Sequence, residues 1–198
     1  MGSIESHEDG RFDTRDLLDG WDPSEHNGVA APEHALPYGT YVLIEAACPD
    51  PALRLVEPIC GIEIRAQSQE VFLMLEDKRI TSPVCVRKID KRSGLPILKP
   101  GTTVELLRKE EDGTYQRMEF DVHYPDNTTV SSFVIDEDGF IWFPAQLDWG
   151  TYAIRETKAV PPYLVANEAV EFVVDEHHDW GEGGIEITLA DEAATGTI

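Results

Sequence analysis

Three ionisable residues each end a row of apolar side chains in a predicted β-strand. Successive side chains of a strand point to opposite faces, so every second residue shares a face. By this parity the three polar side chains turn toward the same side as the apolar ones. The residues and their strands are Lys88 in VCVRKID, Glu156 in GTYAIRET and Asp191 in IEITLAD. The sequence therefore predicts three inward ionisable groups, and burying any of them unpaired would be expensive.

An amine and two carboxyl groups in an apolar core could form an amide bond. Desolvation favours the neutral forms of amines and carboxylic acids, which are the forms that react. Lys88 would attack the side-chain carbonyl carbon of Asp191, while Glu156 would carry protons to the departing water and stabilise the polarised carbonyl. The fold would hold the partners at a high effective concentration.

The same pattern permits simpler interpretations. Lys88 and Glu156 could form an ordinary buried salt bridge, or Lys88 could extend its ammonium group to the edge of the domain. Two neighbouring lysines are poorer candidates for a crosslink, because Lys91 lies in the turn KIDKRSG and Lys99 stands beside Pro100. Both are expected to be solvated.

The elements that must position these residues are short strands. From residue 36 onward, alternating apolar runs are separated by turns such as EDGT, YPDN and DEDG. The candidate strands are YVLIE, GIEIRA, EVFLMLE, PVCVRKI, TVELLRK, YQRMEFDV, TVSSFVI, FIWFP, TYAIRET, AVEFVV and GIEITLA. So many short strands without a convincing helix predict an all-β sandwich in which antiparallel pairing dominates.

An internal repeat runs through these strands, because LPYGTYVLIEAA matches LDWGTYAIRETK at a constant offset. Glu45 is thereby the counterpart of Glu156, and Asp77 is the counterpart of Asp191. The earliest lysine, Lys78, follows both acids of the first copy, so this copy cannot form the bond alone. We expect a truncated unit whose lysine strand lies upstream in a longer protein, or else a unit that never crosslinks.

Several motifs of the second copy occur in an order that is typical of one family. KIDKRSGLPILKPGTTVELLRK is followed by IDEDGFIWFPAQLDWGTYAIRETKA, then by NEAVEFVV and ITLAD. From Ser82 to about Ala193 the chain resembles a Cna B-type repeat, the SpaA-like module of Gram-positive surface proteins and pilins. The lysine strand, the DEDG turn, the GTYxxxET box and the last two strands of that family all have a similar segment here. Their order carries the resemblance, since any single motif is a weak signal.

The resemblance implies an Ig-like, prealbumin-like antiparallel sandwich with an intramolecular isopeptide bond. Lys88 would be the amine, Glu156 the catalyst and Asp191 the partner. Many family members have Asn at the last position, so Asp191 would release water instead of ammonia. Pilin shafts of the family often carry a Tyr-Pro-Lys-Asn motif whose lysine joins subunits, but VHYPDN has Asp126 in that place. We therefore do not expect polymerisation through this motif, and no LPxTG sorting signal follows residue 191.

These patterns predict an organisation and a role. Residues 1–35 form an acidic, flexible segment, residues 36–81 the C-terminal half of a truncated unit, residues 82–193 a complete unit and residues 194–198 a tail. The resemblance implies a structural stalk or spacer of an extracellular, cell-wall-associated adhesin or pilin-like protein. Its partners would be neighbouring repeats of the same longer protein, and self-crosslinking would be its only chemistry.

Composition argues against several other function classes. The 198 residues include 38 acidic and 16 basic side chains, and the formal charge of −22 disfavours nucleic acid and anionic membranes as partners. No apolar run is long enough for membrane insertion, and MGSIESHEDG lacks the features of a signal peptide, so a protein acting outside a cell would be a fragment. Without a Gly-rich phosphate loop or a nucleophile elbow, neither a multiple-turnover enzyme nor a cofactor is expected.

A metal site and a ligand site are the remaining alternatives. DEHHDWGE gathers acids and histidines, but adjacent side chains on an extended chain point to opposite sides, so a solvated loop is expected and no metal. Loops at one end of the sandwich could bind a glycan or a host matrix protein through Trp142, Trp149 or Trp180. A Trp in such a strand more often anchors the core.

The cysteines are the last residues with reactive side chains. Cys48, Cys60 and Cys85 show no metal-binding spacing, and their odd number excludes a fully paired disulfide set within one chain. Cys48 and Cys60 could pair, but separate buried thiols are expected.

Overall fold

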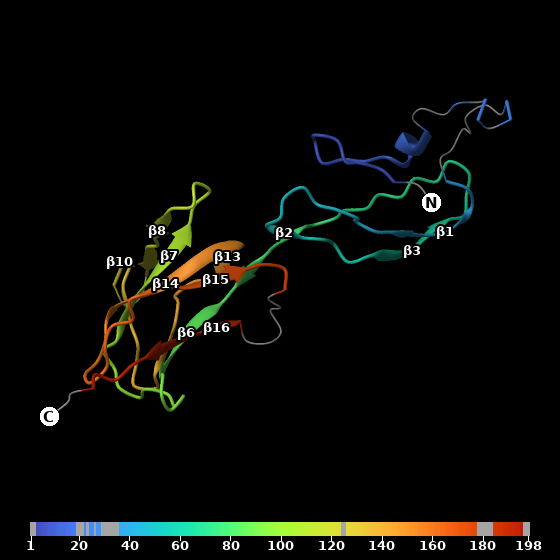
Figure 1. Ribbon diagram of the computed structural model, residues 1–198. Coiled ribbons are helices and arrows are strands. Elements are labelled where there is room, and N and C mark those ends of the chain that lie inside the picture. Colours follow the sequence, from blue (N-terminus) through green and yellow to red (C-terminus); the bar gives the residue numbers. More distant parts are fainter. Residues whose placement is uncertain are drawn as a thin grey trace. The chain divides into compact units, whose positions relative to one another are not determined.

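The computed structural model separates into two compact units (Figure 1). It describes residues 3–18, 22, 24–25, 27–28, 36–123, 126–177 and 184–195. Unit 1 comprises Met1–Ala47 and Leu55–Glu76, and unit 2 comprises Cys48–Arg54 and Asp77–Ile198. The domain boundaries expected from the sequence were drawn from its internal repeat, whereas the two units are defined by how the chain packs. The expected boundaries therefore stay a prediction.

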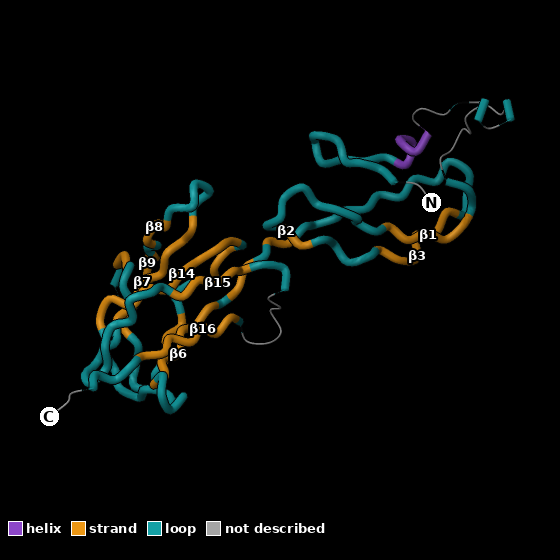
Figure 2. The backbone as a smooth tube through the Cα atoms, in the orientation of Figure 1, coloured by secondary structure: helices purple, strands orange, loops and turns teal. Residues whose placement is uncertain are grey.

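Unit 2 is built from two main β-sheets, drawn in orange in Figure 2. One has the strand order β11-β7-β14-β15, with β8 beside β7, and the other has the order β12-β6-β16. The first sheet contains β7 (Thr103–Lys109), β8 (Tyr115–Arg117), β11 (Phe133–Val134), β14 (Gly150–Lys158) and β15 (Val170–Val174). The second contains β6 (Val84–Asp90), β12 (Phe140–Trp142) and β16 (Ile185–Asp191). The all-β sandwich expected from the sequence is confirmed.

Short strand pairs accompany the two main sheets. These are β2 (Leu53–Arg54) with β4 (Lys78–Arg79), β5 (Thr81–Ser82) with β13 (Leu147–Asp148), and β9 (Phe120–Val122) with β10 (Thr128–Val130). The strand predicted for YQRMEFDV is divided between β8 and β9, and the strand predicted for TVSSFVI is divided between β10 and β11.

The pairing of β6 with β16 is parallel, whereas the other strand pairs in the described residues are antiparallel. Figure 1 shows these two strands side by side. Their register places Leu189 opposite Lys88 and Asp191 opposite Asp90. The first and last long strands of the unit are therefore direct neighbours, although most of its sequence lies between them.

The facing surfaces of the two sheets form an apolar core. Burial alternates along β16, in which every second residue from Ile185 to Asp191 is buried. An aromatic cluster fills one part of the core, where Phe133 packs edge-on against Phe120 and Phe143 at ring-centroid distances of 5.7 and 4.9 Å. The core thus forms from the rows of side chains that strand parity predicts.

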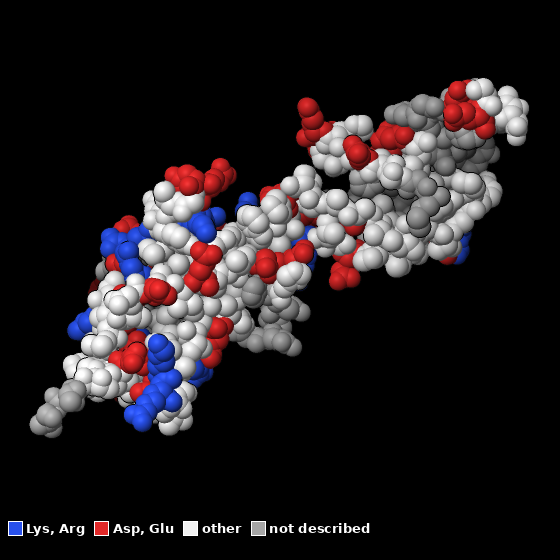
Figure 3. Space-filling model, viewed as in Figure 1, with Lys and Arg blue, Asp and Glu red and all other residues white. Residues whose placement is uncertain are grey.

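The outward faces of unit 2 carry paired charges. Arg87 on β6 donates to Glu186 on β16 over 2.7 Å, and Arg155 on β14 donates to Glu105 on β7 over 2.6 Å. Positive and negative side chains are interspersed on the face of this unit seen in Figure 3. Exposed pairs of this kind add little stability, but they join neighbouring strands in their observed register.

Unit 1 contains a hairpin that repeats part of unit 2. In it β1 (Gly39–Leu43) pairs antiparallel with β3 (Ile59–Ile64), and Gly39 lies opposite Ile64. In unit 2, β14 and β15 pair in the same way, with Gly150 opposite Val174. The repeat found in the sequence is thus also a repeat of strand pairing.

The strand predicted for EVFLMLE is wrong. Residues 70–76 are not in a strand, and the side chains of Phe72 and Met74 are 89% and 90% exposed. The equivalent segment of unit 2 is β16, which is a strand because β6 provides hydrogen-bonding partners along it. Among the described residues of unit 1, no strand pairs with residues 70–76.

Other sequence expectations also need correction. A short 3₁₀ helix, Thr14–Leu18, lies in the acidic N-terminal segment. Trp142 is 46% exposed and does not anchor the core, because Ile141 and Phe143 take the inward parity of that strand. Trp149 is also exposed. Trp180 lies outside the described residues.

The three cysteines are free thiols in different environments. Cys85 is buried in β6, whereas Cys60 is exposed and Cys48 is intermediate. The expectation of buried thiols therefore holds only for Cys85. Cys60 lies in the β1–β3 hairpin, where a two-stranded sheet cannot cover both of its faces.

Among the described residues, no helix combines the length and apolar character that crossing a bilayer requires.

A glycine in the DEDG turn allows a close approach that supports β6. Gly139 has φ +78°, its carbonyl oxygen accepts the backbone N–H of Lys88 at 2.8 Å, and an added Cβ would lie 2.9 Å from the carbonyl oxygen of Ile97. Gly113 has a similar φ of +81° but has open space around it.

We predict that Gly113→Ala lowers the free energy of unfolding by about 1 kcal/mol, from backbone strain alone. Gly139→Ala should cost about 1–3 kcal/mol more, because Ile97 must also shift.

Urea unfolding of the two variants and the wild-type protein checks this difference. Equal losses for Gly113→Ala and Gly139→Ala would contradict a close approach at the DEDG turn.

Candidate functional site

The core of unit 2 brings together the three ionisable residues that the sequence singled out. Lys88 lies on β6 and Asp191 at the end of β16, in the same sheet, while Glu156 lies on β14 of the facing sheet. Their exposed fractions are 1% for Lys88, 4% for Glu156 and 1% for Asp191. The inward orientation expected from strand parity is confirmed for all three.

Lys88 contacts both acids directly. Its Nζ atom donates to Glu156 Oε1 over 2.5 Å, and it also donates to Asp191 Oδ1 in a very short hydrogen bond. Lys88 and Asp191 are 103 positions apart in the sequence. The parallel pairing of β6 and β16 makes this contact possible, because it places the ends of the two strands together.

The Asp191 carboxyl group is held in conditions that favour its protonated form. Burial raises the pKa of Asp191 above its ordinary value of 3.8, the nearby Lys88 ammonium opposes this rise, and Glu156 adds to it. In the described structure, Asp191 Oδ2 is buried and has no hydrogen-bond partner. An ionised carboxylate with a buried, unpartnered oxygen would be costly, so both observations favour a neutral Asp191.

Glu156 is fixed by a backbone contact that sequence reasoning missed. Its Oε2 atom accepts the N–H group of Ala166 at 2.7 Å, which leaves Oε1 directed at Lys88. Ala166 belongs to the loop after β14, and its side chain carries no polar group. No side-chain signal could have identified it.

A tyrosine holds the start of β14 in place. The hydroxyl group of Tyr152 donates to the backbone oxygen of Asp148 at 2.8 Å, and its ring stacks on Phe172 at a centroid distance of 5.6 Å. Sequence reasoning placed Tyr152 in the apolar row but did not identify this hydrogen bond. The recurrence of GTY in both copies was the available signal.

The first copy contains matching contacts in unit 1. Tyr41 donates to the backbone oxygen of Pro37 at 2.6 Å, and Glu45 Oε2 accepts the N–H group of Val56 at 2.7 Å. Asp77, the predicted counterpart of Asp191, belongs to unit 2, where Cys48 Sγ lies 4.0 Å from its Oδ2. The backbone contact of the glutamate is therefore present in both copies.

The two other lysines considered as crosslinking partners lie away from the buried acids. Lys91 is largely exposed and lies 3.8 Å from Glu192. Lys99 is also exposed, and its Nζ atom donates to the backbone oxygen of Pro161 at 2.8 Å. Solvation was expected for both, and the contact of Lys99 with Pro161 was not.

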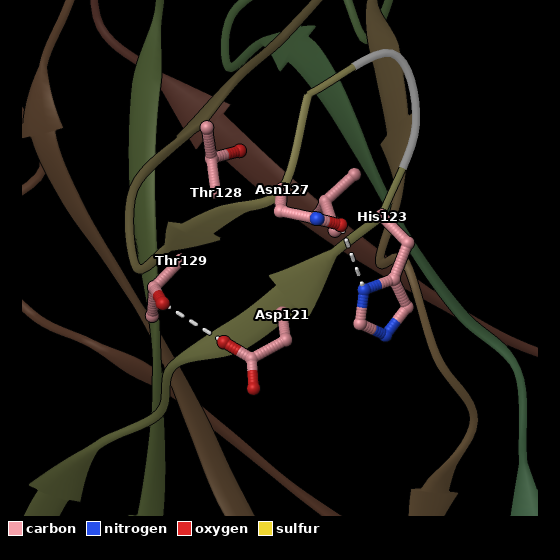
Figure 4. A pocket seen from close by; sticks show the side chains of 6 residues that line it. Asp121, His123, Asn127, Thr128 and Thr129 are labelled. Carbon is pink, nitrogen blue, oxygen red and sulfur yellow. Dashed lines mark hydrogen bonds between the residues drawn. The ribbon is translucent and has the colours of Figure 1, made fainter.

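A polar hollow of about 240 Å³ lies beside the β9–β10 hairpin (Figure 4). Thr129 donates to Asp121 at 2.8 Å, and His123 Nδ1 lies 3.3 Å from Asn127 Oδ1. Its lining residues are Asp121, Val122, His123, Asn127, Thr128 and Thr129. Neither of the exposed tryptophans considered for ligand binding is among them.

The acidic and histidine-rich segment is described only in part. Asp175, Glu176 and His177 are described, whereas His178 and Asp179 lie outside the described residues. The backbone N–H of His177 donates to Asp175 Oδ1 at 2.9 Å, which is a local turn contact.

The chain is similar to several solved structures. The Bacillus anthracis TIE protein is 22% identical with a TM-score of 0.49, and the match covers 81% of this chain and 26% of that one. A streptococcal ancillary pilin is 20% identical with a TM-score of 0.42, covering 80% and 43% of the two chains. The minor pilin GBS52 of Streptococcus agalactiae is 16% identical with a TM-score of 0.46, covering 98% and 82%. The chain thus spans less than half the length of the first two.

Family membership is shown by a sequence comparison. No curated protein matches the chain. A family model described as SpaA, prealbumin-like fold domain, matches residues 85–187. The match begins within β6 and includes Lys88, it covers β14 with Glu156, and it ends within β16. Because it covers more than half of the 198 residues, the chain belongs to the SpaA prealbumin-like fold domain family.

Proposed function

We propose that unit 2 is a structural stalk module that stabilises itself with an isopeptide bond between Lys88 and Asp191. The observation that carries the proposal is the buried contact of the Lys88 amine with two carboxyl groups. A buried lysine needs only one acid to balance its charge. The second acid is what a crosslinking reaction would require.

The reaction is a condensation with a single turnover. Lys88 passes a proton to Glu156 Oε1 and becomes a neutral amine, and its Nζ atom attacks Cγ of the protonated Asp191. The Nζ–Cγ bond forms, and the bond from Cγ to one Asp191 oxygen breaks. Glu156 carries protons from nitrogen to that oxygen, which leaves as water. The products are an amide and one water molecule, and Glu156, which began ionised, ends protonated with the proton that Lys88 first gave up.

The fold itself supplies most of what the reaction needs, namely proximity of the groups, a protonated Asp191 and exclusion of water. The three groups already touch, so the entropy of bringing them together is part of folding. The raised pKa of Asp191 favours the neutral form of this group, which is the electrophilic one. Exclusion of bulk water also disfavours hydrolysis of the product.

The bond would serve a stalk because of where it closes the chain. It joins β6 to β16 and so encloses almost the whole unit. Tension applied to the two ends of the unit would pass through the amide, and the strands between would carry little of it. We infer an extracellular, cell-wall-associated adhesin or pilin-like protein in which neighbouring repeats are the partners. Family membership and the Cna B-type motif order support this role.

A ligand-binding module without a crosslink is the second candidate. The polar hollow beside β9 and β10 favours it, since hydroxyl, amide and carboxylate groups suit a glycan. This candidate leaves the second buried acid unexplained, so we prefer the stalk.

Intact mass tests the proposal directly. We predict that the wild-type chain, measured under denaturing conditions, is lighter than its calculated mass by one water molecule. Lys88→Ala and Glu156→Ala should have their full calculated masses, because they lack the amine and the proton carrier. Lys91→Ala is the control and should still lose water. A wild-type chain of full mass would rule out the crosslink and favour the ligand-binding module.

Stability gives a second test. Closing a loop of about 100 residues should stabilise unit 2 by about 5 kcal/mol, by analogy with a disulfide of that span. In guanidinium chloride, Glu156→Ala should unfold at a clearly lower midpoint than wild type, and Lys91→Ala should not. Equal midpoints for Glu156→Ala and wild type would contradict a stabilising crosslink.

The pH dependence of stability tests the protonation state of Asp191. Its pKa is raised in the folded state, so its favourable contribution is complete below the ordinary value of 3.8 and is lost as the pH rises through the folded pKa. Lys88→Met, which cannot crosslink, should therefore lose stability relative to Lys88→Met/Asp191→Asn as the pH rises. Thermal unfolding from about pH 4 to about pH 8 checks this. Parallel stability curves would contradict a raised pKa.

A further inference from the structure

The loop of residues 160–166 connects the two sheets that carry the reacting groups. It begins just after β14, the strand of Glu156, and then pairs with the residues that follow β16. Ala194 N–H donates to the oxygen of Pro162 at 2.8 Å, and Leu164 N–H donates to the oxygen of Glu192 at 3.0 Å. Between these contacts, Tyr163 and Ala193 form an antiparallel bridge. The loop therefore ties the strand of Glu156 to the strand of Asp191.

The start of the loop is also held to unit 2 by side chains. Lys99 Nζ donates to the oxygen of Pro161 at 2.8 Å. Burial and the neighbouring Asp90 raise the pKa of Tyr163, so this tyrosine lies beside the residue that is opposite Asp191 in the parallel pair. These contacts leave the loop little freedom to move away from the reacting groups.

The end of the loop reaches the proposed catalyst. Ala166 N–H donates to Glu156 Oε2 at 2.7 Å, so this oxygen is engaged on the side away from Lys88. The other oxygen, Oε1, is the one that faces the Lys88 amine. A single backbone donor thus distinguishes the two carboxylate oxygens.

The first copy contains the same hydrogen bond from a backbone N–H group to the glutamate, so this contact recurs in the fold. Val56 N–H donates to Glu45 Oε2 at 2.7 Å, the distance found in the second copy. The loop sequences around the two donors differ, VEP in one copy and ANE in the other. Because the donor is a backbone group, the contact is kept without any shared side chain.

We propose that the loop of residues 160–166 is a positioning element for crosslinking, in which the Ala166 N–H group orients Glu156 to take the proton from Lys88. This inference rests on the crosslinking function proposed above. The loop also fixes the distance between the two sheets near the reacting groups. One sheet carries Lys88 and Asp191, and the other carries Glu156.

Replacing the N–H donor tests the inference. Wild-type and variant chains are assembled by chemical ligation in denaturant, so that each starts without the crosslink, and are then transferred to refolding buffer. Crosslinking is followed by intact mass in quenched samples, and folding is followed in parallel by tryptophan fluorescence. Replacement of Ala166 by lactic acid changes the N–H group to an ester oxygen and keeps the methyl group and backbone freedom. We expect folding at the wild-type rate and crosslinking slower by about ten- to hundredfold, the usual worth of a hydrogen bond to a charged group.

Matched variants separate the role of the donor from general damage. Ala166→Pro removes the same donor and should also crosslink slowly, whereas Ala166→Gly keeps it and should crosslink near the wild-type rate. Val56→Pro removes the equivalent donor of the first copy and should leave the crosslinking rate of unit 2 unchanged.

The outcomes distinguish this inference from the proposed function. If the lactic acid variant crosslinks as fast as the wild-type chain, the positioning role is overturned and the crosslinking function still stands. A wild-type chain that never loses water would overturn the crosslinking function itself, and the positioning role with it.

Discussion

A lysine in the middle of an apolar sandwich constrains the strands around it. The Lys88 side chain is almost fully buried, so its charge must be balanced inside the core. The two acids that contact it come from two strands in different sheets. A slip of β16 by one residue would turn Asp191 to the solvent side and Ala190 inward, and a slip of β14 would do the same to Glu156. The register of β14 and of β16 therefore depends on contacts with the Lys88 side chain. The distance between the two sheets at that point depends on the same contacts.

The two copies separate local structure from structure that needs a distant partner. The first copy forms its hairpin, its tyrosine hydrogen bond and the backbone contact of its glutamate, although no lysine strand pairs with it in the described residues. These features depend on residues close together in the sequence. The last segment of the copy behaves differently, because residues 70–76 remain outside any strand. A strand at that position depends on hydrogen bonds from a segment at the other end of the unit.

This division also explains what the sequence could predict. Strand parity was enough to place Lys88, Glu156 and Asp191 inward, since alternation is a property of each strand alone. The parallel neighbours β6 and β16 could not be deduced from alternation, which says nothing about which strands pair. The backbone donor at Ala166 left no trace in residue types. EVFLMLE was predicted as a strand because its pattern equals that of β16, and the pattern does not show whether a partner is present.

The parallel pairing of β6 and β16 gives unit 2 a direction. The chain enters at the N-terminal end of β6 and leaves at the C-terminal end of β16, so the two connections lie at opposite ends of the strand pair. Without the proposed amide, a pull on these connections would act along the strands and load their hydrogen bonds together in shear, whereas a hairpin pulled at its open end would unzip one bond at a time. The same geometry lets the chain pass through the unit from one end to the other without a net reversal of direction.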